Sequence, residues 1–449
     1  MPGPSSKYFS DVGDFERFIL ENEEAGTSRL LLSHVEWPSP PDGFILSGFG
    51  GKDLAISTIE ARHKLRDKVP EWYSMSSLVY PSSLCAEQCS SSVTAGYKAS
   101  LAKRILDGAP GRVADLTGGL GVDSWAFSSV ASEVLYNERN SDLVAAARHN
   151  FNELAASNIR VENVEVEKDS LGMLLSGFTP DIVFLDPARR DSSGGKVFLL
   201  EDCSPNVLGL ISDLFRYSPN ILLKLSPMAD ITMVVERLNR SYESALMESG
   251  SSGWNGNWVR EIHVVSSMGE CKELLVWMDR DWNGEYSVIC REDGGSISMS
   301  YSELTGAKPV LPDSSFVRYL YEPGKSLAKA GAFNVLCERF SLVKLARFTH
   351  LLTFPEAVTK EEAKSRLGVL TGMGKLFEVD EVLKMSKASM REVGKRYPRS
   401  EVSARNIPLT SAELRARLGV KSGDDAHVFG VRIETPFQAD NFLLVCHRI

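Results

Sequence analysis

Four acidic residues stand at or just past the ends of short apolar runs in the middle of the chain. They are Asp115, Glu138, Asp169 and Asp186. The preceding runs are rich in β-branched residues, which is typical of buried strands. Ligands of a doubly wound parallel sheet bind outside the carboxyl ends of its strands. We therefore expect the four carboxylates to lie along one edge of a sheet, where they can accept hydrogen bonds from ligand hydroxyl and amino groups.

A glycine turn follows the first of these runs and leads into a helix. Its polar and glycine positions are Asp115, Thr117, Gly118, Gly119, Gly121 and Asp123. Glycine suits a turn where the backbone approaches a ligand closely and a Cβ would collide with it. Such turns also serve nicotinamide and flavin cofactors, or only pack tightly. The turn alone therefore leaves the ligand open.

Glu138 narrows the choice, because it ends the next strand 23 residues after Asp115. A carboxylate there can accept both hydroxyl hydrogens of a cofactor ribose; the alternative is a solvated surface glutamate. A nicotinamide site would require Gly-x-Gly-x-x-Gly, and the string from Gly119 to Ser124 matches only its first two glycines. An oxidoreductase is disfavoured for this reason. A nicotinamide site would also give no role to Asp186-Pro187.

The fourth strand ends in Asp186, Pro187, Ala188 and Arg189. Asp186 can accept from an amino group, and the Arg189 guanidinium can stack on a base or bind phosphate. The alternative role for Asp186 is to cap a strand-to-loop turn. Lys224, after the fifth strand, either faces the substrate or snorkels from the sheet. Cys203 is the only candidate for a thiol nucleophile near this loop, and packing is the preferred role for it.

The positioning elements follow from alternating strand and helix patterns, which predict an α/β fold with a doubly wound, Rossmann-like sheet. Strands are expected at 112–116, 133–137, 161–166, 181–185, 220–225, 258–266 and 273–278, the last two as an antiparallel edge pair. Further along, 286–290 and 297–301 read as strands, 316–321, 335–342 and 411–418 as helices, and 427–433 as a strand. We expect four parts: a helical segment at 1–95, the sheet domain at 96–279, and small α+β parts at 280–330 and 331–449.

Composition limits the class of protein. With 43% apolar and 24% charged residues among 449, the chain can build buried cores, and no segment reads as a membrane span. The N-terminus lacks the pattern of a secretory signal, so a cytoplasmic location is expected. Seven cysteines form no CxxC pair, which favours reduced thiols and no metal site. Nothing in the sequence indicates an oligomeric state.

A basic stretch interrupts a chain whose net charge is −9. Between Lys384 and Arg405 seven basic residues face two acidic ones, a local net charge of +5, and Lys395, Arg396 and Arg399 lie in its middle. Such a patch can contact the phosphates of a nucleic acid. The alternative is a solvated helix face. Upstream of the first strand, Gln88 and Lys98 are polar groups that either approach a substrate or belong to an ordinary amphipathic helix.

Several of these stretches together resemble one family. They are 87–98, 115–123, 186–190, 321–333 and 404–409. They resemble bacterial S-adenosylmethionine-dependent methyltransferases that carry a small ferredoxin-like segment and a C-terminal THUMP-like domain. Thr117 departs from the family's usual turn, where a glycine is common. Asp186 to Arg189 occupies the place of an Asp/Asn-Pro-Pro-aromatic tetrapeptide in related nucleobase methyltransferases.

The resemblance implies S-adenosylmethionine as the cofactor. Asp115 and the backbone from Thr117 to Gly121 would face its methionine part, Glu138 its ribose and Asp169 its adenine. Gln88 and Lys98 would belong to a segment that closes over the cofactor. The THUMP-like region implies RNA as the partner. Three functions remain: an RNA base methyltransferase, which is favoured, a methyltransferase acting on a small molecule or protein, and a non-catalytic RNA-binding protein.

Overall fold

The computed structural model describes residues 13–41, 50–189, 200–249 and 256–449. These residues form two compact units, one built from Met1–Val259 with Val276–Asn283 and the other from Arg260–Leu275 with Gly284–Ile449. No helix of the described ranges is long and apolar enough to cross a membrane.

The first unit begins with short helices, as the sequence predicted for its first 95 residues. They are α1 (Asp14–Asn22), α2 (Thr27–Leu32), α3 (Gly51–Leu65), α4 (Pro70–Tyr73), α5 (Ser83–Gln88) and α6 (Ser92–Ile105). The last helix starts with a capping box, in which the Ser91 and Thr94 side chains each bond the other's backbone N–H. The bend between α5 and α6 is thereby fixed.

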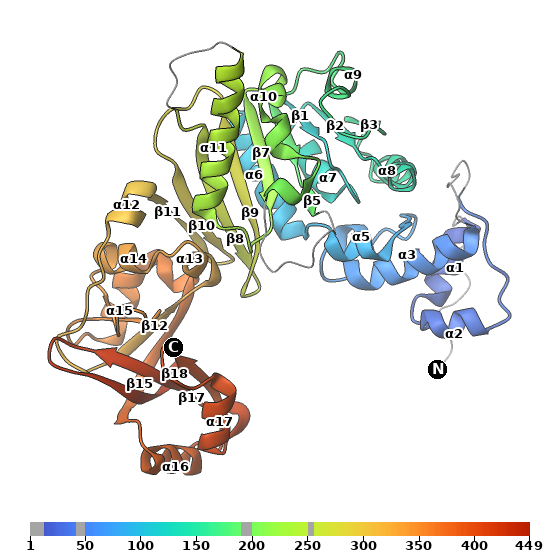
Figure 1. The fold of residues 1–449 in the computed structure, drawn as a ribbon. Coiled ribbons are helices and arrows are strands. Elements are labelled where there is room, and N and C mark those ends of the chain that lie inside the picture. Colours follow the sequence, from blue (N-terminus) through green and yellow to red (C-terminus); the bar gives the residue numbers. More distant parts are fainter. Residues whose placement is uncertain (1–12, 42–49, 190–199, 250–255) are drawn as a thin grey trace. The chain divides into compact units, whose positions relative to one another are not determined.

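Strands and helices then alternate along the chain. The strands are β1 (Arg112–Asp115), β2 (Glu133–Asn137), β3 (Ile159–Glu162), β4 (Ile182–Leu185), β5 (Ala188–Arg189), β6 (Cys203–Ser204) and β7 (Asn220–Leu225). The helices are α7 (Val122–Ser128), α8 (Ser141–Glu153), α9 (Leu171–Leu174), η1 (Leu200–Asp202), α10 (Val207–Tyr217) and α11 (Ile231–Glu248). Figure 1 shows α10 and α11 side by side over the strands.

Four further strands extend the sheet: β8 (Val259–Ser267), β9 (Glu270–Asp279), β10 (Ser287–Glu292) and β11 (Gly295–Ser300). The strand order is β11-β10-β8-β9-β7-β4-β1-β2-β3. Strands β3, β2, β1, β4 and β7 are parallel, which confirms the predicted doubly wound class. The prediction of β8 and β9 as an edge pair was wrong, because β10 and β11 continue the sheet beyond β8.

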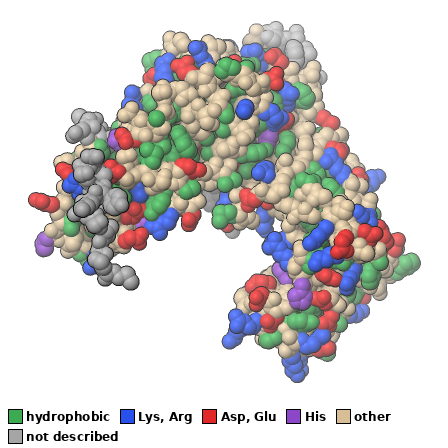
Figure 2. Space-filling view, turned by 180° about the vertical axis from the view of Figure 1, so that it is seen from behind, with side chains coloured by type: hydrophobic (Ala, Val, Ile, Leu, Met, Phe, Trp, Pro, Cys, Tyr) green, Lys and Arg blue, Asp and Glu red, His purple; other side chains and the backbone are tan. Residues whose placement is uncertain are grey.

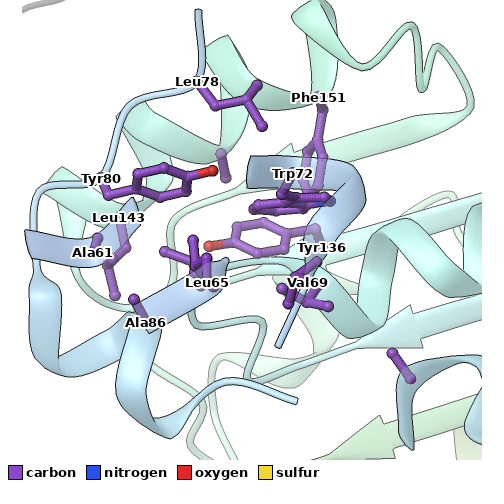
Figure 3. Close-up of a cluster of buried hydrophobic side chains, with 14 of the residues drawn as sticks. Ala61, Leu65, Val69, Trp72, Leu78, Tyr80, Ala86, Tyr136, Leu143 and Phe151 are labelled. Carbon is purple, nitrogen blue, oxygen red and sulfur yellow. The ribbon is translucent and has the colours of Figure 1, made fainter. Parts of the chain in front are cut away.

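The N-terminal helices share a hydrophobic core with the sheet. Leu65, Val69 and Trp72 pack around Tyr136 of β2, together with Phe151 of α8 (Figure 3). Trp72 and Tyr136 are fully buried. The Tyr136 ring lies against the glycine turn after β1. The helices α3 and α4 pack on Tyr136 and so support that turn.

The second unit continues with a seven-stranded sheet. Its strands are β12 (Tyr319–Pro323), β13 (Val343–Lys344), β14 (Leu352–Thr353), β15 (Gly374–Lys384), β16 (Arg399–Arg405), β17 (Lys421–Glu434) and β18 (Ala439–Arg448), in the order β13-β14-β12-β15-β18-β17-β16. Its helices are α12 (Tyr301–Gly306), α13 (Lys325–Lys329), α14 (Phe333–Phe340), α15 (Lys360–Leu367), η2 (Gly368–Gly372), α16 (Lys387–Arg396) and α17 (Ser411–Leu418).

The prediction of a helix at 316–321 was wrong. Tyr319, Leu320 and Tyr321 belong to β12 and pair with β15, and the last two also pair with β14. All three side chains are buried. A buried run of aromatic and aliphatic residues fits a central strand, and neighbours distant in sequence decided its conformation.

Candidate active site

A cavity of about 900 Å³ lies at the carboxyl ends of the parallel strands. Its walls come from the loops after β1, β2, β3 and β4, from Lys224 of β7, and from the α5 region, which includes Gln88. Small-molecule and cofactor sites have volumes of roughly 300–1,000 Å³. The lining includes Asp115, Thr117, Gly118, Gly119, Gly121, Asp123, Glu138, Asp186 and Lys224. One cavity therefore unites most of the residues that the sequence singled out.

The glycine turn is shaped by aromatic side chains behind it. A Cβ on Gly118 would lie 2.2 Å from the Tyr136 ring, and one on Gly121, whose φ is +97°, would lie 2.7 Å from Phe151. Gly119 has φ +53°, and nothing lies within 4 Å of a Cβ built there. The Tyr136 hydroxyl donates to the Gly119 carbonyl at 2.6 Å. At Gly118 and Gly121, packing requires glycine, whereas Gly119 leaves open space for a ligand.

Thr117 stands where the resembling family commonly has glycine, and the structure gives its side chain a role. Its Oγ1 accepts a hydrogen bond from the Asp186 backbone N–H at 2.6 Å. The neighbouring Leu116 N–H donates to the Phe184 carbonyl at 3.0 Å. The first bond connects the loops after β1 and β4, and the second connects the loop after β1 to β4 itself. The threonine therefore positions Asp186.

Asp115 lies buried at the base of the cavity, only 1% exposed. It accepts hydrogen bonds from the Ser124 hydroxyl (2.6 Å) and from the Thr117 N–H (3.2 Å). Burial raises the pKa of Asp115 to about 7; the two hydrogen bonds oppose this rise, and the charges of Asp123 and Asp186 add to it. A cationic group bound beside Asp115 would favour its ionised form.

Asp123 is held by a buried polar cluster that the sequence reasoning did not identify. It accepts from the Ser90 hydroxyl at 2.8 Å and pairs with the Lys98 ammonium at 3.0 Å, while Lys98 also donates to Ser90 at 2.7 Å. Lys98 is fully buried and does not line the cavity. This position does not fit the expected substrate contact, because Asp123 and Ser90 occupy its ammonium inside the protein. Lys98 positions Asp123 instead.

Glu138 has both carboxylate oxygens fixed by backbone donors. Oε2 accepts from the Gly119 N–H at 3.0 Å and Oε1 from the Asn140 N–H at 2.8 Å. A carboxylate held in this way faces the cavity in one orientation and keeps lone pairs for further donors. Its geometry fits the expected contact with a pair of ribose hydroxyls.

Asp169 lies exposed and outside the cavity lining. The wall on this side is formed by residues 164–168, including Glu165, Glu167 and Lys168. The expected strand at 161–166 ends earlier, at Glu162. The Asn137 side chain explains this, since it accepts from the Val164 N–H (2.9 Å) and donates to the Val164 carbonyl (3.0 Å). Asp169 therefore does not reach the cavity that unites the other expected cofactor contacts, and residues 164–168 line it on this side.

Asp186 meets Lys224 directly, with its Oδ2 hydrogen-bonded to the lysine Nζ. No described residue donates to the other carboxylate oxygen, Oδ1, so it can accept from a substrate. Pro187 is buried behind it. The backbone of Arg189 pairs with Cys203 in the β5–β6 ladder. The side chain of Arg189 and all of Arg190 lie outside the described residues.

Two thiols in or near this region, Cys203 and Cys89, are not poised as nucleophiles. Cys203 is fully buried and does not line the cavity. Cys89 does line it, but burial raises the pKa of its thiol to about 11, so the thiol stays protonated at neutral pH. Within the described ranges, no three His, Cys, Asp or Glu side chains gather as a metal site.

Sequence reasoning also missed Ser90, Ser124, Asn137 and the cavity-lining Arg139. Ser124 gives one weak signal, because it is a polar residue among the apolar positions that open α7. The other three give none, since their partners lie on other elements of the fold.

The basic stretch is partly neutralised within the second unit. Arg396 binds Glu381 through two hydrogen bonds (2.8 and 2.5 Å), and Arg405 pairs with Glu322 at 2.8 Å. Lys387, Arg391 and Lys395 lie one turn apart on α16, are exposed and form no ion pair with described residues. Arg399 is also exposed. Basic and acidic side chains are interspersed on the face that Figure 2 shows.

Comparisons with known proteins agree with this architecture. A ferredoxin-like domain model matches residues 319–360, and a THUMP domain-like model matches residues 374–448. The first overlaps the expected 280–330 segment only at 319–330, and the second lies within the expected 331–449 part. No curated protein is significantly similar to the chain.

One solved structure matches almost the whole chain. It is the "putative methyltransferase" of Porphyromonas gingivalis W83, with 28% identity, 97% coverage of both chains and a TM-score of 0.77. A "putative RNA methyltransferase" of Pyrococcus horikoshii has 16% identity, a TM-score of 0.30, and coverage of 39% of this chain and 82% of its own. The T. thermophilus 16S rRNA N2 G1207 methyltransferase with AdoMet and guanosine has 12% identity, a TM-score of 0.29 and 42% coverage of both chains.

The full-length likeness and the two domain matches confirm the resemblance drawn from the sequence. The chain has the fold of the S-adenosylmethionine-dependent methyltransferases, followed by ferredoxin-like and THUMP-like parts.

Proposed function

We propose that this protein transfers a methyl group from S-adenosylmethionine to a nucleobase in RNA. The methyltransferase class draws its support from the full-length likeness, and the cofactor from the residues that line the cavity; the nucleobase target is our proposal. The observation that carries it is one cavity shared by the open backbone at Gly119, the fixed carboxylate of Glu138 and the Asp186–Lys224 pair. The RNA part draws its support from the THUMP-like match and the exposed cations of α16.

The residues present fit this cofactor. Gly119 leaves room for close approach, Glu138 offers oriented oxygens for ribose hydroxyls, and Asp115 offers a carboxylate for the cationic methionine end. Leu143 and Val166 add apolar wall area. When bound, S-adenosylmethionine supplies an electrophilic methyl group on a sulfonium sulfur.

The chain's own part is to orient the acceptor and handle its proton. Asp186 Oδ1 would accept from the N–H of an exocyclic amino group, which fixes the direction of the nitrogen lone pair. Lys224 holds the other oxygen and compensates the negative charge of Asp186. After transfer, Oδ1 is the atom placed to take the proton that the nitrogen loses.

The test is methyl transfer from labelled cofactor to total RNA of a strain that lacks the gene, followed by identification of the modified nucleoside. We expect label in RNA with the parent protein and none with Asp186→Ala, while cofactor affinity stays within a few-fold. Glu153→Ala, an exposed carboxylate at the end of α8, is the matched control and should behave like the parent.

Two outcomes would contradict the proposal. Label only in protein or small molecules would replace RNA with one of those substrates. Parallel loss of cofactor binding and transfer in Asp186→Ala would remove this residue from the substrate side of the site.

A further inference from the structure

Phe348 and Phe437 are the two most exposed phenylalanines among the described residues, 75% and 89% exposed respectively. A single exposed apolar side chain is common on protein surfaces. Here the two rings stand on two loops of the second unit that are bonded to each other. Phe348 lies between β13 and β14, and Phe437 lies in the turn between β17 and β18.

Both loops are held in place by internal hydrogen bonds. The buried Lys344 ammonium donates to the Arg347 carbonyl at 2.6 Å, and Thr349 Oγ1 donates to the Arg432 carbonyl at 3.1 Å. In the other turn, Thr435 Oγ1 accepts from the Phe437 N–H at 3.3 Å and from the Gln438 N–H at 3.2 Å. The rings are therefore presented on ordered backbone, which lowers the entropy cost of binding a partner.

The two loops meet at Glu434. Its backbone N–H donates to the Leu345 carbonyl at 2.7 Å, and its carboxylate accepts from the Arg347 N–H at 3.3 Å. Phe348 follows Arg347 directly, and Phe437 lies three residues after Glu434. These two bonds thus connect the backbone segment that leads to Phe437 with the segment that leads to Phe348.

Two arginines stand on the segments that carry the rings. Arg347 is exposed and Arg432 is partly exposed, and neither guanidinium bonds a described residue. Glu434 accepts a hydrogen bond from the Arg347 N–H through one carboxylate oxygen and keeps its negative charge. The exposed His350 ring stacks on Phe333 with centroids 4.1 Å apart and planes 8° apart. Burial and nearby cations lower the pKa of His350, so it presents a neutral flat ring at pH 7.

Exposed aromatic rings and guanidinium groups on segments that are bonded to each other suit one kind of ligand well. Bases of a single strand stack on such rings, while its phosphates pair with the cations. The hairpin that carries Phe437 also bonds the segment leading into α16, because the Met385 N–H donates to the Asn441 carbonyl at 2.9 Å. The helix that carries the exposed Lys387, Arg391 and Lys395 therefore begins beside the same hairpin.

From this arrangement we infer that Phe348 and Phe437 form a stacking site for bases of single-stranded RNA. The inference rests on the proposed function and names where on the second unit an unpaired part of the substrate is held. Arg347 and Arg432 supply the phosphate contacts of this site.

The experiment measures the affinity of the full-length protein for a fluorescent single-stranded oligoadenylate, with an RNA duplex of equal length for comparison. Stacking on a protein ring accounts for about 1–3 kcal/mol per base, so Phe348→Leu with Phe437→Leu should weaken single-strand binding about tenfold or more. Phe348→Tyr with Phe437→Tyr keeps the rings and should bind like the parent. Met268→Asn, at an apolar side chain 85% exposed in another turn of this unit, is the control and should change nothing.

The double variant Phe348→Leu with Phe437→Leu separates stacking from simple apolar contact, because leucine is apolar but has no ring. If it binds the oligoadenylate as well as the parent, or if the parent does not bind the oligoadenylate at all, the stacking site is wrong. A protein partner captured equally by the phenylalanine and leucine forms, without RNA binding, would also overturn it. If the double leucine variant methylates cellular RNA with an unchanged KM, the stacking site is rejected and the proposed function stands. If the parent protein transfers no methyl group to RNA, the proposed function itself is rejected.

Discussion

The Thr117 hydroxyl oxygen lies 2.6 Å from the backbone nitrogen of Asp186 and accepts its hydrogen bond. The bond connects the turn that we propose faces the cofactor to the loop that carries the proposed acceptor-binding carboxylate. A glycine at this position would supply no such acceptor. Thr117 therefore couples the two halves of the site.

We expect Thr117→Val to lower kcat for methyl transfer while cofactor affinity changes little. Valine keeps the shape but leaves the Asp186 N–H without its partner, and an unsatisfied buried donor costs about 1–3 kcal/mol. Thr117→Ser restores the hydroxyl and should recover most of the rate. Steady-state kinetics beside a cofactor titration checks this. Equal rates for the valine and serine variants would show that the bond does not matter for catalysis.

Glu138→Ala should weaken cofactor binding by about 1.5–3 kcal/mol, because it removes charge-assisted hydrogen bonds to the ribose. Asp169→Ala is the matched control, since Asp169 lies outside the cavity lining and should leave affinity unchanged. Calorimetry with the demethylated cofactor measures both. If Asp169→Ala lost affinity for the cofactor and Glu138→Ala did not, Asp169 rather than Glu138 would be the cofactor-binding carboxylate.

The buried carboxyl of Asp115 should make folding stability fall as pH rises toward neutrality. Its pKa in the folded state, about 7, lies above the ordinary value, so the folded protein holds this proton more tightly than the unfolded chain. The stabilisation is complete below the ordinary pKa near 4 and is lost as pH rises through 7. The loss is of the order of a few kcal/mol, at about 1.4 kcal/mol per pKa unit.

Asp115→Asn carries no titrating proton and should lack this part of the pH dependence. Urea unfolding of both proteins between pH 4.5 and 8 gives the comparison, with the difference in unfolding free energy changing most around pH 5 to 7. Parallel curves for the two proteins would mean that Asp115 ionises normally in the folded state.

The exposed cations of α16 should bind RNA phosphates. Replacing Arg391 and Lys395 with Ser should lower RNA affinity and flatten the dependence of log affinity on log salt by about 1 to 2, since each phosphate contact contributes about 0.7–0.9 to that slope. Lys360→Ser with Lys364→Ser removes the same charge at the same helical spacing from α15 and should change the slope less. A titration of RNA at three salt concentrations gives the slope for the α16 and α15 variants. Equal slopes for the two would mean that the α16 cations make no special contact with RNA.

Arg396 provides a further comparison within α16. Its guanidinium is held by Glu381, and this contact also lowers the pKa of the Glu381 carboxyl. We expect Arg396→Ser to affect RNA binding less than Arg391→Ser. The opposite order would mean that the Arg396–Glu381 pair opens when RNA binds.

The sequence alone was sufficient for the fold class and for most of the residues that line the candidate site. The strand, glycine turn and helix from Val113 to Ser128 form a local pattern, and parallel strands bring Asp115, Glu138 and Asp186 to one edge whatever the rest of the chain does. Glycine at Gly119 and Gly121 follows from backbone conformation, which local sequence largely fixes. These features depend on neighbours a few residues away.

Tertiary structure decided what depends on distant partners. Asn137 bonds the backbone of Val164 and ends β3 early, which moves the cavity wall away from Asp169. Lys98 is buried against Asp123, and Arg396 is occupied by Glu381, although nothing in the sequence around Lys98 or Arg396 indicated these partners. Residues 319–321 form a strand because β14 and β15 flank them. Residue type specifies what a side chain can bond, but the packed fold determines which partner it meets.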